Sequence, residues 1–194
     1  VAINIAYILG NSPVRIWAVG WNDRPAGGTE MEEMKSVVRE AMEEGAWGLS
    51  TGLDYPPGSY SDTAELVELA SEASRLGGIY HTHLRNTLGD QFLDPVKEAL
   101  EIGQRAEIPC HLTHFYQTLT HSGSARQLLE LVDSAVARSQ DVTMDCYPYT
   151  YSSTRLLIMF PQWAHDGGPE KLKEVLRSPE GRERLRQEVR PRSG

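Results

Sequence analysis

Ile79-Tyr-His-Thr-His83 and Ile108-Pro-Cys-His-Leu-Thr-His114 are two short, mostly apolar stretches, and each of them ends in a histidine. Short apolar runs bounded by turn residues are typical of buried strands, whereas apolar residues three and four positions apart indicate amphipathic helices. A helical pattern that begins at Asp94-Pro95 separates the two stretches. A strand, a helix and a second strand in this order predict a right-handed βαβ unit with parallel strands.

The same alternation continues on both sides of this unit. Thr29 with Glu32 resembles a capping box, and Ser61 is a candidate cap of the next helix. Further strands are predicted at Val1–Leu9, Trp47–Ser50 and Val142–Cys146. Further helices are predicted from Thr29 to about Gly45, from Ser61 to Gly77, over about 124–138 and, with many charges, over about 170–189.

The ends of the predicted strands recur at a regular interval. Ser50, His83, His114 and Asp145 close consecutive strands, at separations of 33, 31 and 31 residues. Such an interval suits one βα unit of a (β/α)8 barrel, in which reactive groups gather at the carboxyl ends of the strands. We therefore expect an α/β fold, a partial (β/α)8 TIM-type barrel with about four to five βα units. A complete barrel typically needs about 250 residues, so residues 1–194 are expected to form the central part of one.

Composition and charge narrow the classes of partner. The formal net charge is −8 and the sequence pI is about 5.3, so nucleic acids and anionic membranes would be repelled. No apolar run approaches the roughly 20 residues of a membrane-spanning helix. Cys110 and Cys146 lie in different apolar segments, which argues against a disulfide framework and favours a reducing, cytoplasmic location. A small molecule is the expected partner.

His83 and His114 are the candidate metal ligands. Equivalent positions at the ends of adjacent parallel strands lie side by side, so both imidazoles could reach one cation at about 2.0–2.1 Å. A third protein ligand is not evident in the sequence. The alternative is that both are core histidines whose ring N–H groups have protein partners.

The other histidines are expected to have lesser roles. His81 shares the strand parity of His83 and is expected to pack or to support the site one layer deeper, whereas His111 is expected to face the helices. His121 and His165 fall in predicted loops.

Several polar residues follow the same strand ends. Asp145 could be a metal ligand, a general base or a partner for a backbone amide, and its spacing alone favours the last. Arg85 could clamp a substrate carboxylate through two parallel hydrogen bonds or form an ion pair. Hydroxyl groups at this end of the sheet come from Tyr55, Tyr116, Tyr147 and Ser153.

The amino-acid sequences of several motifs resemble those of a known family. Gly45-Ala-Trp-Gly-Leu-Ser-Thr-Gly-Leu-Asp-Tyr-Pro-Pro-Gly-Ser-Tyr60, His-Leu-Arg at 83–85, Leu-Thr-His at 112–114 and Asp145-Cys-Tyr-Pro-Tyr-Thr-Tyr-Ser-Ser-Thr154 are similar to the N-acyl-D-amino-acid deacylase (D-aminoacylase) family of the amidohydrolase superfamily. The similarity runs from about residue 2 to residue 168. It implies a metal-dependent barrel with an accessory β-domain, zinc as cofactor, and hydrolysis of the amide bond of N-acyl-D-amino acids.

The resemblance also implies roles for single residues. It transfers the metal ligands to His83 and His114, and it places Arg85, Tyr55, Tyr147 and Ser153 around the substrate carboxylate. Three positions depart from the family's pattern: Asn86-Thr87 stands where Asp-Glu is common, and Tyr116 stands where a lysine is usual.

The family's first-strand His-x-His, its neighbouring metal ligand and its late catalytic Asp have no counterpart in the 194 residues. The general acid/base is therefore expected outside this chain, which by itself is expected to be inactive. Two alternatives remain open: another amidohydrolase, such as a dihydroorotase-like cyclic amidase, and a non-catalytic remnant. Because open strand edges favour pairing between chains, a homo-oligomer is expected in either case.

Overall fold

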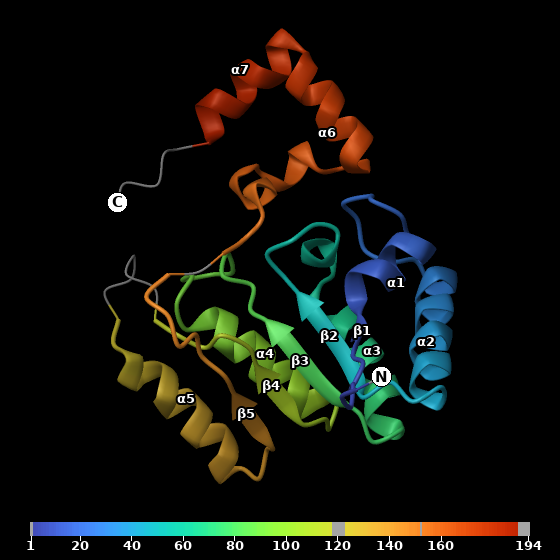
Figure 1. Cartoon of the computed structure of the whole chain (residues 1–194), viewed down its shortest axis with the longest axis vertical. Helices are drawn as coiled ribbons and strands as arrows, with labels where there is room; N and C mark the ends of the chain where they lie inside the picture. Colours follow the sequence, from blue (N-terminus) through green and yellow to red (C-terminus); the bar gives the residue numbers. More distant parts are fainter. Residues whose placement is uncertain (1, 118–122, 152, 190–194) are drawn as a thin grey trace.

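The computed structural model describes residues 2–117, 123–151 and 153–189 and contains a five-stranded, fully parallel sheet (Figure 1). The strands lie in chain order, β1 to β5, and each pairs with the next. Their bounds are Leu9–Gly10 for β1, Gly48–Gly52 for β2, Ile79–His83 for β3, Cys110–Leu112 for β4 and Val142–Met144 for β5. The expected α/β fold with parallel strands is confirmed, and it is consistent with part of a TIM-type barrel.

Five helices connect the strands, two of them between β1 and β2 and one between each later pair, and they pack against their neighbours in chain order. They are α1 (Asn11–Ala18), α2 (Gly28–Glu43), α3 (Thr63–Arg75), α4 (Asp94–Arg105) and α5 (Ala125–Ala137). Short 3-10 turns lie at Gly58–Tyr60, Leu156–Met159 and Gln162–Ala164, and the chain ends in α6 (Gly168–Arg177) and α7 (Pro179–Glu188). Figure 1 shows α6 and α7 standing apart from the sheet and its helices. Among the described helices, none has the length and apolar character needed to cross a bilayer.

Burial alternates along the strands, because successive side chains point to opposite faces of a sheet. On β3, Tyr80 and Thr82 are buried against the helices, whereas Ile79, His81 and His83 are half-buried. The same alternation places Leu49, Cys110 and Leu112 in the core together with Leu66, Leu69, Ala70 and Ala73 of α3. We call the opposite side, which carries His81 and His83, the open face of the sheet.

A glycine allows β2 and β3 to start side by side. Gly48 has φ +155°, and a Cβ built on it would lie 2.0 Å from the carbonyl oxygen of Ile79. Any larger residue would therefore push the two strands apart at the point where their pairing begins.

The prediction of a buried strand at Val1–Leu9 is wrong. In the described part of this run only Leu9 joins the sheet, paired with Leu49 of β2, and Ile3 is 73% exposed. Since β1 is an edge strand with a neighbour on one side alone, the preceding apolar residues have no second strand to cover them.

Helix starts and caps differ from prediction at four places. No helix is predicted directly after residue 10, but α1 lies there, and its signals are Pro13 in the first turn and the four-residue spacing of Val14 and Ala18. The cap of α3 is Asp62, whose carboxylate accepts the amide N–H of Glu65 at 2.8 Å, and not Ser61. At α2 the carboxylate that accepts a backbone N–H is that of Glu30, bonded to Gly27 at 2.7 Å, so the Thr29–Glu32 box is wrong. The charged helix over 170–189 is interrupted at Ser178, which caps α7.

A buried ion pair joins α1 to α3. Arg15 Nη1 lies 2.7 Å from both carboxylate oxygens of Glu65, and the two side chains are 0% and 3% exposed. Arg15 also donates to the carbonyl oxygen of Arg24 in the loop before α2. One guanidinium therefore fixes two helices and a loop, at a position where neither charge has access to water.

We expect Glu65→Ala to lower the free energy of unfolding by about 3–5 kcal/mol, because it leaves the Arg15 charge buried without a partner. The matched control is Glu130→Ala, since the Arg126–Glu130 pair lies on the surface with side chains 86% and 59% exposed. That control should cost less than about 1 kcal/mol. Urea unfolding of the three proteins measures both, and equal effects of the two substitutions would contradict this account.

Candidate metal centre

His83 and His114 meet at the carboxyl ends of β3 and β4, as expected from their spacing. Nδ1 of His83 lies 2.7 Å from Nε2 of His114, and the ring centroids are 4.6 Å apart. His83 is the last residue of β3, where it stands opposite Gly52 of β2. Two imidazole nitrogens at one point of the open face form the core of the candidate centre.

His114 reaches this point through a turn rather than through the strand. β4 ends at Leu112, and His114 then adopts a left-handed conformation with φ +38°. The amide of Phe115 donates to the carbonyl oxygen of Asp145, at 2.7 Å, which ties the turn to the end of β5. The turn re-aims the side chain, so strand parity no longer predicts its direction.

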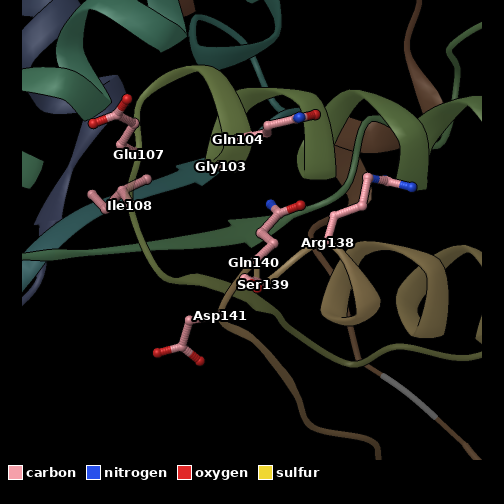
Figure 2. A pocket seen from close by; sticks show the side chains of 8 residues that line it. All are labelled: Gly103, Gln104, Glu107, Ile108, Arg138, Ser139, Gln140 and Asp141. Atoms are coloured by element: carbon pink, nitrogen blue, oxygen red, sulfur yellow. The ribbon is translucent and has the colours of Figure 1, made fainter.

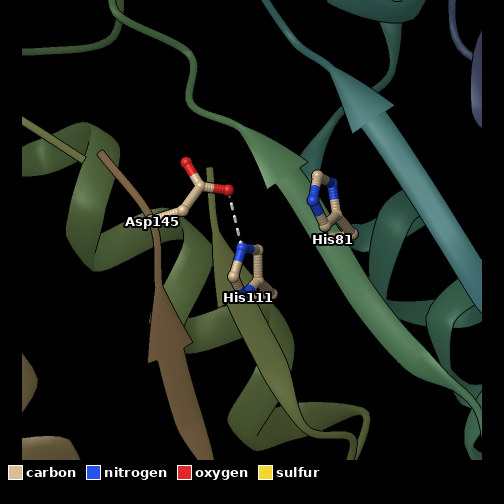
Figure 3. A group of neighbouring side chains, drawn as sticks. All are labelled: His81, His111 and Asp145. Atoms are coloured by element: carbon tan, nitrogen blue, oxygen red, sulfur yellow. Dashed lines mark hydrogen bonds and ion pairs between the residues drawn. The ribbon is translucent and has the colours of Figure 1, made fainter. Parts of the chain in front are cut away.

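The expectation that His111 faces the helices is therefore wrong. His111 is paired with His81 across β3 and β4, and their rings stack at 4.8 Å. Both belong to the open face, one layer below His83 and His114, and Figure 3 shows the two rings beside each other on adjacent strands. Counting alternate positions from His114 back to His111 fails, because the strand ends between them.

Asp145 holds the turn that carries His114. Its carboxylate accepts hydrogen bonds from the backbone amide of His114, from the Thr113 hydroxyl at 3.1 Å and from Nε2 of His111 at 2.9 Å. Partial burial opposes ionisation, but these bonds outweigh it and hold the pKa of Asp145 below its ordinary value. The preferred sequence interpretation, a partner for a backbone amide, is confirmed.

His81, His111 and Asp145 also offer ligand atoms that lie within 4.8 Å of one another (Figure 3). However, His111 uses both ring nitrogens, since Nδ1 lies 2.7 Å from the Thr143 hydroxyl and Nε2 bonds Asp145. A metal there would have to break these bonds. The deeper group is therefore better suited to supporting the turn than to binding a cation.

The upper pair is the better candidate for a divalent cation, because the cation would replace a single hydrogen bond, between Nδ1 of His83 and Nε2 of His114, whereas the deeper group would lose both bonds of His111. Burial lowers the pKa of His114, and the neighbouring His83 lowers it further. The ring therefore stays neutral and keeps a lone pair for a metal. Imidazole nitrogens suit zinc and other transition metals. In addition, Asp54 Oδ1 is buried without a hydrogen-bond partner next to His83, and a positive charge nearby would compensate it.

The predicted hydroxyl residues surround this pair. The ring of Tyr55 lies 5.0 Å from that of His83, and Tyr147 stacks on His114 at 5.5 Å with an interplanar angle of 4°. Tyr116 lies 6.0 Å from His114. Tyr55 Oη lies 2.7 Å from the Thr154 hydroxyl, which brings the segment that contains Ser153 to the same place.

A cavity of about 790 Å³ opens beside Tyr55. Apolar and aromatic side chains form much of its wall, and Tyr55, Ser153, Thr154 and Arg155 supply polar groups; it is lined by Ser12, Pro13, Ile16, Trp21, Gly52, Tyr55, Pro56, Pro57, Ser153, Thr154 and Arg155. Because Gly52 and Tyr55 both adjoin His83, a molecule in this cavity would lie next to the histidine pair.

A second cavity, of about 330 Å³, lies at the opposite end of the sheet (Figure 2). It is lined by residues at the ends of α4 and α5 and just before β4 and β5, namely Gly103, Gln104, Glu107, Ile108, Arg138, Ser139, Gln140 and Asp141. In parallel α/β folds the amino ends of the strands contribute stability rather than chemistry. This cavity is therefore not a candidate active site.

Arg85 has protein partners for its guanidinium group. Nε donates to Glu98 of α4 at 3.0 Å, while Nη1 and Nη2 donate to the carbonyl oxygens of Ser59 and Ser61, each at 2.7 Å. The Arg85 and Glu98 side chains are 11% and 5% exposed. A substrate carboxylate would have to displace these bonds, so the predicted contact has no support from this arrangement.

Of the two remaining histidines, His165 lies away from the pair and His121 is not among the described residues. His165 is buried near α6, where its Nε2 lies 3.1 Å from the carbonyl oxygen of Leu157. His121 lies outside the described residues.

Comparison with known proteins places the chain in context. No protein-family model matches it. D-aminoacylase of Alcaligenes xylosoxydans xylosoxydans is 36% identical over 156 residues, which are 80% of this chain and 32% of that protein. The chain is homologous to the N-acyl-D-amino-acid deacylases. It spans about a third of the length of the curated deacylases that it matches.

Solved deacylase structures agree with this relationship. N-acyl-D-glutamate deacylase from Bordetella bronchiseptica, complexed with zinc and a phosphonate inhibitor, is 31% identical with a TM-score of 0.71 and matches 76% of this chain and 31% of its own. A D-aminoacylase that defines a novel subset of amidohydrolases is 27% identical with a TM-score of 0.71, over 98% of this chain and 42% of its own. The resemblance inferred from the sequence motifs is thereby confirmed.

Proposed function

We propose that this chain forms the central part of the catalytic barrel of a zinc-dependent N-acyl-D-amino-acid deacylase. The observation that carries the proposal is the 2.7 Å approach of His83 Nδ1 and His114 Nε2 at the carboxyl ends of two strands, in a chain homologous to deacylases. The cyclic amidase alternative would use the same pair, so it differs in the substrate and not in the metal chemistry.

His83 and His114 would hold the zinc ion through these two nitrogens. When bound, the ion polarises the amide carbonyl and makes a water molecule available as nucleophile near neutral pH. The protein contributes the neutral state of His114, the turn fixed by Asp145 and a partly buried setting that limits competition from bulk water.

Substrate binding falls to the hydroxyl groups around the pair. Tyr55, Tyr147, Tyr116 and Ser153 can donate hydrogen bonds to a carboxylate: Tyr55 and Ser153 line the 790 Å³ cavity, whereas Tyr147 and Tyr116 lie against His114. The apolar wall formed by Ile16, Trp21 and the prolines would accept the side chain or the acyl group. In this arrangement Arg85 supports the loop at 58–61 rather than touching the substrate.

Proton transfer to the leaving amine needs a group that the described residues do not offer at the pair. Asp54 is bonded to His83 and Asn86, and Asp145 is engaged by three donors of the β4 turn and its surroundings. We therefore infer that the general acid/base lies outside residues 1–194, together with any further metal ligand, and that this chain is inactive by itself.

Zinc content tests the metal site. The purified chain should bind zinc in a buffer that contains the ion, and the double variant His83→Ala/His114→Ala should lose this binding. His165→Ala is the matched control, because it removes an imidazole that lies away from the pair, near α6, and should leave the zinc content unchanged. Elemental analysis after gel filtration measures all three, and equal zinc in the wild type and the double variant would remove the hypothesis.

The reaction is tested with the protein at the full length that its natural gene encodes. That protein should release free D-amino acids from N-acetyl-D-amino acids, and zinc removal by a chelator should abolish the release until zinc is restored. Parallel assays use the L-enantiomers as a control and cyclic imides as the competing substrate class. Activity confined to cyclic imides would favour the dihydroorotase-like alternative over ours.

We also infer that the chain self-associates in the cytoplasm. Two strand edges support this: β1 has a neighbour only in β2, and β5 only in β4, with Thr143 and Met144 of β5 exposed. Unpaired edge groups can bond a second copy of the chain. Cys110 and Cys146 are both free thiols, which suits a reducing compartment.

Light scattering coupled to size exclusion measures this association. We expect a mass above that of one 21.6 kDa chain, unchanged by reductant, since backbone pairing requires no disulfide. A stable monomer contradicts the strand-edge proposal. An oligomer that falls apart in reductant points instead to Cys146, the exposed thiol, and contradicts the reducing location as well.

A further inference from the structure

Asp54 is a buried carboxylate beside the histidine pair that the proposed reaction does not use. It lies in the loop after β2, and its side chain is 7% exposed. Oδ2 lies 2.9 Å from Nε2 of His83 and 2.8 Å from Nδ2 of Asn86, whereas Oδ1 is buried and has no hydrogen-bond partner among the described residues. His83 and Asn86 therefore both donate to Oδ2 of Asp54, and His83 is a candidate metal ligand.

The position of Asp54 determines which nitrogen of His83 can bind a metal. A carboxylate accepts hydrogen bonds, so the proton of the neutral ring is held on Nε2. Nδ1 then carries the lone pair, and it is Nδ1 that faces Nε2 of His114 at 2.7 Å. The ring is thus held in the tautomer that a cation between the two histidines requires.

The same geometry argues against Asp54 as a ligand. Nε2 and Nδ1 lie on different edges of the imidazole, so a carboxylate bonded to Nε2 is separated by the ring from a cation at Nδ1. Its negative charge can still act through the ring, because it strengthens the basicity of a ligating histidine. A cation at Nδ1 would in turn offset the buried charge of Asp54, whose Oδ1 has no donor.

Asn86 completes the arrangement. Its amide donates to Asp54 at 2.8 Å, and a second hydrogen bond, to the carbonyl oxygen of Leu84 at 3.2 Å, fixes its orientation. An aspartate at position 86 would place two carboxylates at hydrogen-bond distance and repel Asp54 from His83. Asn86 is therefore the partner that allows a carboxylate at position 54.

We propose that Asp54 is a positioning residue for the metal ligand His83: it holds the proton on Nε2 and so directs Nδ1 to the cation. The inference rests on the proposed zinc site, and it adds a residue that acts through His83 without touching the metal.

The test compares zinc affinity among variants of the purified chain, measured by competition with a chromogenic chelator. Asp54→Ala should weaken binding about 10- to 100-fold, as loss of a partner of a metal-bound histidine typically does. Asp54→Asn keeps an acceptor without the charge and should fall between Asp54→Ala and the wild type. The matched control, Asp62→Asn, removes a carboxylate that bonds the amide of Glu65 and no histidine, and should leave affinity unchanged.

A second readout needs no metal. Nitrogen-15 spectra of histidine side chains in the zinc-free chain should show His83 protonated on Nε2 in the wild type, with this preference reduced in Asp54→Ala. A merely structural role of Asp54 would not change the tautomer of one ring. If Asp54→Ala fails to fold, Asp54→Asn and its spectrum decide the question.

The outcomes separate this inference from the proposed function. Tight zinc binding by both wild type and Asp54→Ala, with unchanged tautomers, overturns the role of Asp54 and leaves the histidine site intact. A wild type that binds no zinc overturns both. A graded loss from wild type through Asp54→Asn to Asp54→Ala, with Asp62→Asn unaffected, supports both.

Discussion

Parallel pairing of β2, β3 and β4 is the constraint on which the candidate centre depends. Parallel strands end at the same edge of a sheet, so residues far apart in the sequence meet there. Gly52 stands opposite His83, and Tyr80, His81 and Thr82 stand opposite Cys110, His111 and Leu112. Because this register is fixed, the ends of the three strands and the loops after them bring Asp54, His83 and His114 together.

The sequence predicted the parts of the fold that follow from periodicity. Ile79–His83 forms a strand with the predicted bounds, and Asp94 begins a helix as expected. The failures occurred where periodicity stops applying. His111 was assigned to the wrong face because a left-handed residue at His114 follows the end of β4, and the apolar run up to Leu9 was assigned to the core although it lies at a sheet edge.

Part of the centre could not have been predicted from one sequence. The positions of His83 and His114 follow from strand spacing, whereas the partners of these residues depend on tertiary contacts across many residues. Asp54 is 29 residues from His83, and Asp145 is 31 residues from His114. Arg85 illustrates the opposite case, since a side chain that looked available for substrate is bonded to Glu98 and to two backbone carbonyls.

Asp145 directly follows β5 and bonds the turn that carries His114, so the position of β5 affects the geometry of the candidate centre. The carboxylate and the carbonyl oxygen of Asp145 bond the amides of His114 and Phe115, and the next strand along therefore sets where the imidazole stands. A shift of β5 by one residue relative to β4 would leave both histidines at their places in the sequence. It would nevertheless move Nε2 of His114 relative to Nδ1 of His83. Sheet-edge substitutions would thus change the spacing of the histidine pair while both histidines stay in place in the sequence.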